Sequence, residues 1–137
     1  MFAYCENISS IDLSDFSFYY IKDVSSMFKG CRNLSSIILD GDGFGRTIHM
    51  NHMFEGCSSL TSVSIFDFSY NKAKTQDMSR MFYGCSNLTT IKNVIDMSSC
   101  TNYDDMFYNC PKLTNVKIEN PPSGFDGAGL SSSQYTL

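Results

Sequence analysis

The chain has 137 residues, of which 42% are hydrophobic and 18% are charged, and its formal net charge is -4. This length and apolar share favour a single folded domain, and the negative charge argues against nucleic acid or an anionic membrane surface as a partner. Because the apolar runs are only a few residues long, we expect no membrane-spanning segment.

A motif made of Met-Phe, two further residues and Cys occurs five times along the chain. The methionines are Met1, Met27, Met53, Met81 and Met106, and the matching cysteines are Cys5, Cys31, Cys57, Cys85 and Cys110. Successive methionines are therefore separated by 26, 26, 28 and 25 residues. A fixed period of this size is typical of stacked repeats, in which each repeat contacts mainly its neighbours.

The segment before each cysteine has the spacing of one helix face. Val24, Met27, Phe28 and Cys31 stand at positions i, i+3, i+4 and i+7, and the next three repeats keep this spacing. Asp23 lies where a side-chain acceptor caps a helix N-terminus. Residues that tolerate a left-handed conformation stand before the last four motif cysteines, at Gly30, Gly56, Gly84 and Asn109. The pattern predicts two turns of helix per repeat.

The segment after each cysteine carries three aliphatic rows. The first two rows are complete, and they consist of Ile8, Leu34, Leu60, Leu88 and Leu113, and of Ile11, Ile37, Val63, Ile91 and Val116. In the third row Leu13, Leu39, Ile65 and Ile118 are aliphatic, and Asn93 departs from the pattern. One residue separates the second row from the third, which predicts a half-buried strand.

Stacking the repeats lines up equivalent side chains as continuous ladders inside a right-handed coil. The expected ladder residues of the three middle repeats are Met27, Phe28, Cys31, Leu34, Ile37, Met53, Phe54, Cys57, Leu60, Val63, Met81, Phe82, Cys85, Leu88 and Ile91. In the connections between repeats, we expect Phe16, Phe44 and Phe68 to turn inward and close the core.

The Met-Phe-x-Gly-Cys motif, the aliphatic pattern after it and the period together resemble the BspA-like leucine-rich repeats, and in particular the Met-Phe-Gly-Cys type of surface-protein repeat. The resemblance covers residues 1–118. It implies an α/β fold, a right-handed leucine-rich-repeat solenoid of about five turns with one short parallel strand and one short helix per repeat. Residues 119–137 are rich in Gly, Ser and Pro, which suits an irregular C-terminal cap or linker.

Five of the six cysteines share one phase of the repeat, on the apolar face, which favours buried and reduced thiols. Disulfides between neighbouring repeats are the alternative, but they would leave one of the five unpaired. Cys100 lies out of phase, so we expect it on a loop and as the most reactive thiol.

No constellation for catalysis, a metal or a cofactor has support, so we do not expect an enzyme. Asp40 and Asp42 in a glycine-rich stretch resemble the start of a calcium loop, but the later acidic ligand is missing, which favours a simple connection. His49 and His52 are the only histidines, and two ligands do not complete a zinc site.

The outward-facing residues are the candidates for contact with a partner. On the strands they are Ser36, Ile38, Ser62, Ser64, Thr90, Lys92 and Lys117; on the other side of the repeats they are Tyr83 and Tyr108; and in the connections they are Tyr19, Tyr20 and Tyr70. For any single row, a merely solvated face is the alternative.

The resemblance implies a non-catalytic recognition module of a bacterial-type cell-surface protein, which is extracellular or at the cell surface and adheres to a host or cell-surface protein. One alternative is a structural subunit that associates end to end into a filament. The other is a carbohydrate-binding surface built on the serine and threonine rows.

Overall fold

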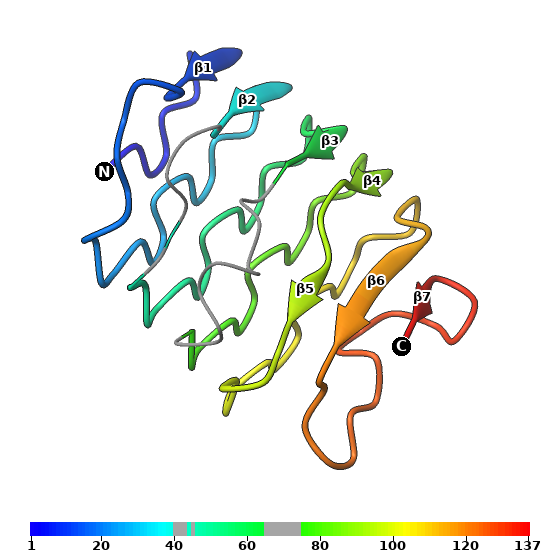
Figure 1. Cartoon of the computed structure of the whole chain (residues 1–137). Coiled ribbons are helices and arrows are strands. Elements are labelled where there is room, and N and C mark those ends of the chain that lie inside the picture. The colour runs from blue at the N-terminus through cyan, green and yellow to red at the C-terminus, as the bar shows by residue number, and fades with distance from the viewer. Residues whose placement is uncertain (40–43, 45, 65–74) are drawn as a thin grey trace.

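The computed structural model shows a stack of repeats with short strands along one side and turns along the other (Figure 1). It describes residues 1–39, 44, 46–64 and 75–137. The strands in these ranges are β1 (Ser10–Asp12), β2 (Ser36–Ile38), β3 (Ser62–Val63), β4 (Thr90–Ile91), β5 (Ile95–Asp96), β6 (Val116–Glu119) and β7 (Tyr135–Thr136).

The strands pair in parallel with their counterparts in the neighbouring repeat. β1 pairs with β2 so that Ile11 lies opposite Ile37, and β3 pairs with β4 so that Val63 lies opposite Ile91. The second aliphatic row of these repeats therefore lies side by side. A third sheet has the order β5, β6, β7.

The fourth repeat departs from this register at its third aliphatic position. Ile95, and not Asn93, pairs with Ile118, and Ile95 is buried. The extra residues between Ile91 and Ile95 let an aliphatic side chain reach the core where the aligned position holds a polar one.

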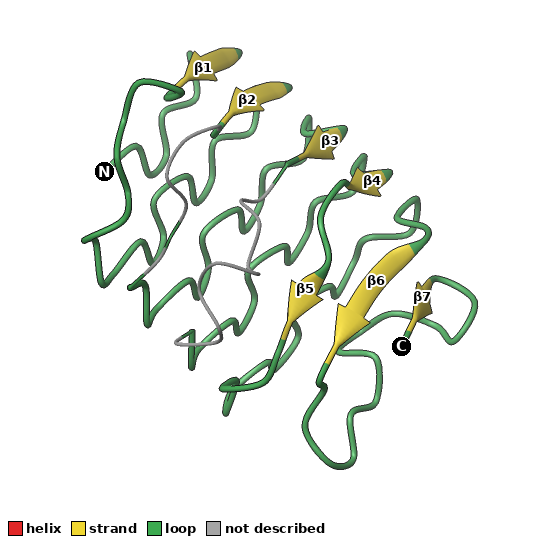
Figure 2. Cartoon of the chain, in the orientation of Figure 1, coloured by secondary structure: helices red, strands yellow, loops and turns green. Residues whose placement is uncertain are grey.

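The expected α/β solenoid with one helix per repeat is wrong, because the described part of the chain contains no helix (Figure 2). The segments expected to be helical are runs of turns, which we call the turn runs: residues 24–31, 50–57, 78–85 and 103–110. Each contains a non-glycine residue in the left-handed region that a right-handed helix excludes, namely Ser26, His52, Arg80 and Asp105, with φ between 53° and 60°.

Hydrogen bonding explains why turns replace the helix. The Met27 N–H closes a turn on the Val24 carbonyl oxygen at 3.2 Å, but the Phe28 N–H donates to the Met53 carbonyl oxygen of the next repeat at 2.9 Å. Every second amide of the turn run crosses between repeats in this way, whereas a helix would direct all of them back along the same segment. The expected cap, Asp23, instead accepts the Ser25 N–H in a local turn.

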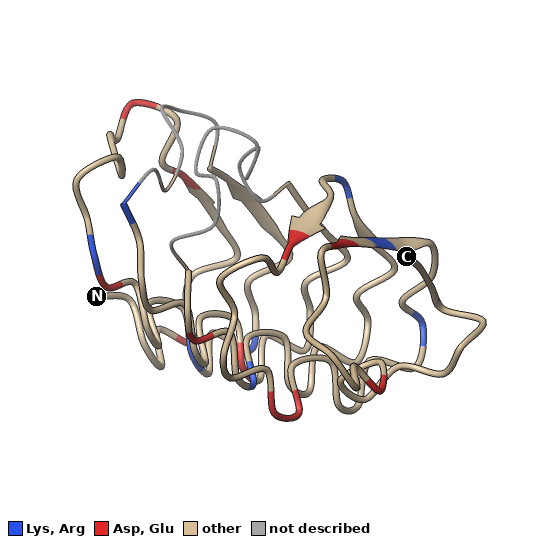
Figure 3. Cartoon of the chain, turned by 60° about the horizontal axis from the view of Figure 1, so that its bottom comes forward, with Lys and Arg blue, Asp and Glu red and all other residues tan. Residues whose placement is uncertain are grey.

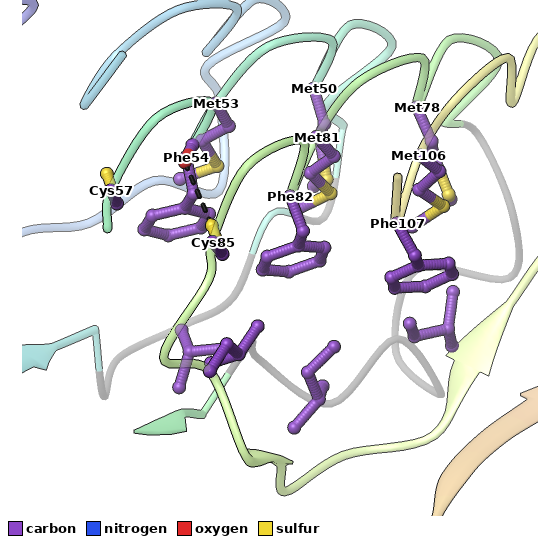
Figure 4. Packing of buried hydrophobic residues seen from close by; sticks show 14 of the residues in the cluster. Met50, Met53, Phe54, Cys57, Met78, Met81, Phe82, Cys85, Met106 and Phe107 are labelled. Carbon is purple, nitrogen blue, oxygen red and sulfur yellow. Dashed lines mark hydrogen bonds between the residues drawn. The ribbon is translucent and has the colours of Figure 1, made fainter. Parts of the chain in front are cut away.

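The core is a set of side-chain ladders along the stack (Figure 4). The rings of Phe2, Phe28, Phe54, Phe82 and Phe107 stack with centroids 5.4 to 5.8 Å apart and interplanar angles of 2° to 12°. All the residues expected to form ladders in the middle repeats are buried. Nearly parallel aromatic stacking of this kind requires repeats that keep the same local conformation.

The first connection between repeats differs from expectation. Phe16 is 53% exposed, while Phe18 is buried with its ring centroid 5.2 Å from that of Phe44. The expectation that Phe16 turns inward is therefore wrong, because Phe18 occupies that interior position. Phe68 and Tyr70 lie outside the described residues.

The C-terminal segment covers the last repeat. The Phe107 N–H donates to the Ala128 carbonyl oxygen at 2.9 Å, and β7 extends the sheet beside β6. Ala128 and Leu130 are buried, and Phe125 packs against Tyr103 with ring centroids 5.3 Å apart. This end of the phenylalanine ladder is thereby shielded from water.

Candidate functional site

Four cysteines of the Met-Phe motifs have a structural role, because their thiols bond one repeat to the next. All six cysteines are free. Four of them donate their S–H across to the carbonyl oxygen of the phenylalanine in the preceding repeat: Cys31 to Phe2 at 3.0 Å, Cys57 to Phe28 at 3.1 Å, Cys85 to Phe54 at 3.1 Å and Cys110 to Phe82 at 3.0 Å. The bond from Cys85 is drawn in Figure 4. Burial raises the pKa of Cys57 and of Cys110 to about 12, so these thiols stay protonated.

Cys100 was expected to be the most reactive thiol, and this is wrong. Cys100 is buried, and its thiol donates to the Asn102 carbonyl oxygen at 3.3 Å. Burial raises its pKa to about 11, which lowers its thiolate fraction at neutral pH. Cys5, which is only partly buried, is the more accessible thiol.

On the strand side, four of the candidate contact residues come together. A hollow of about 330 Å³, which we call the β2–β3 hollow, is lined by Ile37, Ile38, Leu39, Ser62, Ser64 and Lys92. The candidates Ser36, Thr90 and Lys117 are exposed on strands β2, β4 and β6 and do not line the hollow.

The hollow lies where the sheet is interrupted. Within the described residues no β-ladder joins β2 to β3, although the turn runs of the same repeats are hydrogen bonded, as from Phe28 to Met53. Ile37 and Leu39 are buried and form the floor, while Ile38 is 41% exposed at the rim.

The polar side of the hollow keeps free hydrogen-bonding groups. The Ser64 hydroxyl donates to Asn93 Oδ1 at 3.0 Å. In the described structure, the Ser62 hydroxyl makes no hydrogen bond, and the exposed Lys92 ammonium group makes no ion pair. Within the part of the chain that the structure describes, Lys92 is the one charged residue that lines the hollow.

On the turn side, two predicted contact residues are stacked. The rings of Tyr83 and Tyr108 have centroids 5.3 Å apart at 24°, and the Arg80 guanidinium lies 4.0 Å above the Tyr83 ring. Tyr108 is 47% exposed. Because all three residues sit on hydrogen-bonded turns, they form a fixed cluster, which we call the Tyr83–Tyr108 cluster.

An ion-pair network that sequence reasoning missed adjoins this cluster. The Glu55 carboxylate lies 3.1 Å from the Arg80 guanidinium and 3.5 Å from Lys29 Nζ, and it also contacts His52 Nδ1. Burial opposes ionisation of Glu55, but the hydrogen bond with His52 and the charges of Lys29 and Arg80 outweigh it and lower the pKa of Glu55. Figure 3 shows residues of both charges along the turns.

Alignment of the repeats could have predicted one ion pair of this network. Lys29 and Glu55 occupy equivalent positions of adjacent repeats, where opposite charges meet in a stack. The contribution of Arg80 could not be seen, because it depends on the left-handed conformation of that residue.

Tyr19 and Tyr20 form a second exposed aromatic group. Their ring centroids are 4.9 Å apart in an edge-on arrangement, and the Arg46 guanidinium lies 5.8 Å and 5.2 Å from them. Tyr20 is 73% exposed. This group lies on the connections between repeats, away from the Tyr83–Tyr108 cluster, and the structure does not bring the two together.

The described ranges contain neither a metal-binding group of side chains nor a membrane-spanning helix. Among those residues, no group of three or more His, Cys, Asp or Glu side chains could hold a metal ion. His49 pairs through its backbone with Asp23 and Asp77, whereas His52 contacts Glu55. The same ranges contain no helix with the length and apolar character needed to cross a bilayer.

Comparison with known proteins gives one match. The model of a family described as "Mycoplasma protein of unknown function, DUF285" matches residues 1–120, which is consistent with BspA-like repeats. No match was found among curated proteins or among solved structures. Since the match spans all five Met-Phe motifs, the chain belongs to the DUF285 family.

Proposed function

We propose that this chain is a non-catalytic recognition module of a cell-surface protein and that it adheres to a protein on a host or neighbouring cell. The observation that carries the proposal is the Tyr83–Tyr108 cluster, in which Tyr108 remains 47% exposed beside Arg80. Tyrosine and arginine are enriched among the residues that dominate binding energy at protein interfaces.

The contrast between inner and outer positions supports this proposal. The inner row repeats one residue at Phe28, Phe54, Phe82 and Phe107. The position that follows it, on the outside, reads Lys29, Glu55, Tyr83 and Tyr108. A scaffold whose interior is fixed by stacking can change its outer side chains at little cost in stability, which suits a protein that displays a binding surface.

The fixed geometry of the cluster also favours binding. Tyr83 stacks on Tyr108, and Arg80 lies both above Tyr83 and beside Glu55. Because these side chains are already ordered in the free protein, a partner would lose less conformational entropy on contact with them. The location outside the cell is supported by the resemblance to surface-protein repeats.

Binding of the fluorescently labelled chain to intact epithelial cells and to bacterial cells tests the proposal. We expect saturable binding that protease treatment of the cells abolishes and that glycosidase treatment leaves in place. The double substitution Tyr83→Ser with Tyr108→Ser should weaken binding by about 10-fold or more, the effect of losing one strong interface anchor.

The matched control is Tyr4→Asn, which removes a tyrosine that is 65% exposed at the other end of the stack. Asparagine tolerates the positive φ of 59° at this position. If the control weakens binding as much as the double substitution, or if binding is lost with glycosidase and retained with protease, a protein partner at the cluster is refuted.

End-to-end filament formation is the structural alternative. In the described structure, residues 121–137 cover the last repeat, and Gly129 packs against the Tyr108 backbone, which opposes the addition of another chain at that end. Light scattering should therefore give a particle mass that does not grow with concentration. Continuous growth would support the filament instead.

A further inference from the structure

We propose that the β2–β3 hollow binds the side-chain carboxylate of an acidic residue within an extended peptide segment. This inference rests on the proposed function, because the segment would belong to the partner protein. Four of its residues, Ile38, Ser62, Ser64 and Lys92, bring an apolar rim, two hydroxyl groups and one ammonium group to a single site.

The charge of the hollow selects an anion. Lys92 is the one charged residue among the described residues that line it, and in the described structure its ammonium group is bound to no acidic side chain. An ammonium group without a partner gains a charge-assisted hydrogen bond when a carboxylate arrives. The chain as a whole is negative, at -4, so this positive site differs from the average field of the protein.

The hydroxyl and apolar groups of the hollow determine which ligand groups can lie next to the carboxylate. The free Ser62 hydroxyl can donate to a carboxylate oxygen, whereas the Ser64 hydroxyl already donates to Asn93 Oδ1. Ile38 offers exposed apolar surface at the rim. This arrangement fits a carboxylate on a short methylene stem, such as that of glutamate, with the stem against Ile38.

The proposed function favours a peptide over an acidic sugar, because the partner that it names is a protein. β2 and β3 lie side by side at the hollow, but in the described residues they lack the ladder that pairs β1 with β2. Among the described residues that line the hollow, none has an aromatic side chain on which a sugar ring could stack.

The size of the hollow limits how much ligand it holds. Its volume of about 330 Å³ is at the lower end for ligand pockets. One acidic residue with its immediate neighbours fits such a space, so the site would read a local feature of a longer segment. Short peptides are therefore suitable probes.

The test is a titration of the ¹⁵N-labelled full chain with acetyl-Val-Glu-Val-amide and with its Gln analogue. We expect the Glu peptide to shift the amide signals of Ser62, Ser64 and Lys92 and to bind about 2- to 5-fold more tightly than the Gln peptide, the value of one exposed ion pair. Raising the salt concentration should weaken only the Glu peptide.

The variant Lys92→Gln should reduce the affinity for the Glu peptide to that for the Gln peptide. The matched control is Lys117→Gln, which removes an equally solvated lysine that does not line the hollow, and it should change the affinity less than about 2-fold. Equal affinities for the two peptides, equal effects of the two variants, or no Lys92-dependent shifts at about 20 mM peptide would overturn the proposal. Tighter binding of methyl glucuronide than of the Glu peptide would also overturn it.

These outcomes are separable from the proposed function. The cell-binding assay with the Tyr83 and Tyr108 substitutions leaves the hollow intact, and the peptide titration involves no cells. If cells are bound but the Glu peptide is not preferred, only the hollow is refuted. If the Glu peptide is preferred but cells are not bound, adhesion to the tested cells is refuted.

Discussion

The Cys57 thiol donates a hydrogen bond to the Phe28 carbonyl oxygen at 3.1 Å, and the same oxygen accepts the Cys31 backbone N–H at 3.1 Å. One carbonyl group therefore closes the turn of its own repeat and holds the cysteine of the next. The equivalent bond from Cys85 to Phe54 repeats the arrangement. The thiol ladder thus couples the conformation of each turn to the stacking of its neighbour.

Truncation of Cys57 should destabilise the protein. Cys57→Ala leaves a cavity and removes the bond to Phe28, and we expect a loss of about 1 to 3 kcal/mol in the free energy of unfolding, measured with urea. Cys57→Ser keeps a donor and should lose less. The control Cys5→Ala alters a partly exposed cysteine, and an equal loss in that variant would contradict a special role for the buried thiol.

The buried thiols should also make stability fall at alkaline pH. The pKa of Cys57 is raised by burial from 9.0 to about 12, so the unfolded chain loses this proton first as the pH rises. The contribution is fully present below about pH 9 and is lost as the pH rises toward 12. Urea unfolding between pH 7 and pH 11 should therefore show a shallower decline in stability for Cys57→Val than for the unmodified chain. Some decline remains in the variant, because Cys100 and Cys110 also have a raised pKa. Parallel declines would contradict this prediction.

The Glu55 network should stabilise the protein above acidic pH. Because the pKa of Glu55 in the folded chain lies below its ordinary value of 4.5, its contribution is present above about pH 4.5 and is lost as the pH falls through the lowered pKa. Glu55→Gln should cost about 0.5 to 1 kcal/mol at pH 7 and almost nothing at low pH. Glu119 is exposed, and Glu119→Gln is the control. If both variants show the same pH dependence of stability, the Glu55 network is not its cause.

Gly84, which precedes the cysteine of the third turn run, should be replaceable by asparagine more readily than by alanine. Gly84 has φ of +73°, and Asn109 adopts 59° at the equivalent position. An added Cβ at Gly84 meets nothing closer than 3.9 Å, so the cost of Gly84→Ala is conformational, about 1 to 2 kcal/mol. Thermal unfolding should give a smaller loss for Gly84→Asn. An alanine variant as stable as the asparagine variant would contradict the requirement for a left-handed residue.

The sequence was sufficient for the register of the repeats but not for their local conformation. The Met-Phe-Cys period aligned Phe28 with Phe54, and these rings stack. The spacing i, i+3, i+4 and i+7 suggested a helix because consecutive turns place apolar residues at the same intervals. The neighbouring repeat decides between a helix and a run of turns, because it accepts every second backbone N–H. The sequence of a single repeat does not reveal these hydrogen bonds. His52 adopts a left-handed conformation, which a run of turns accommodates and a right-handed helix excludes.

Alignment of the repeats could predict which candidate contact residues share a row, but not how neighbouring rows are arranged in space. Ile38, Ser64 and Lys92 share one outward row, which alignment could show. The missing ladder between β2 and β3 could not be foreseen, because both segments have the same strand pattern. Arg80 was missed for a related reason, since its backbone conformation turns it toward Glu55.

The most direct test of in-register stacking is disulfide formation between engineered cysteines. Ser10 and Ser36 are exposed and lie opposite each other in β1 and β2. Parallel strands are spaced about 4.8 Å apart, which lies within the Cα separation that a disulfide spans. In a Cys5→Ser background, Ser10→Cys with Ser36→Cys should form a bond under mild oxidation, detected by mass spectrometry, whereas Ser10→Cys with Ile38→Cys should not. Equal bonding in both pairs, or bonding only in the second, would contradict the stacked register.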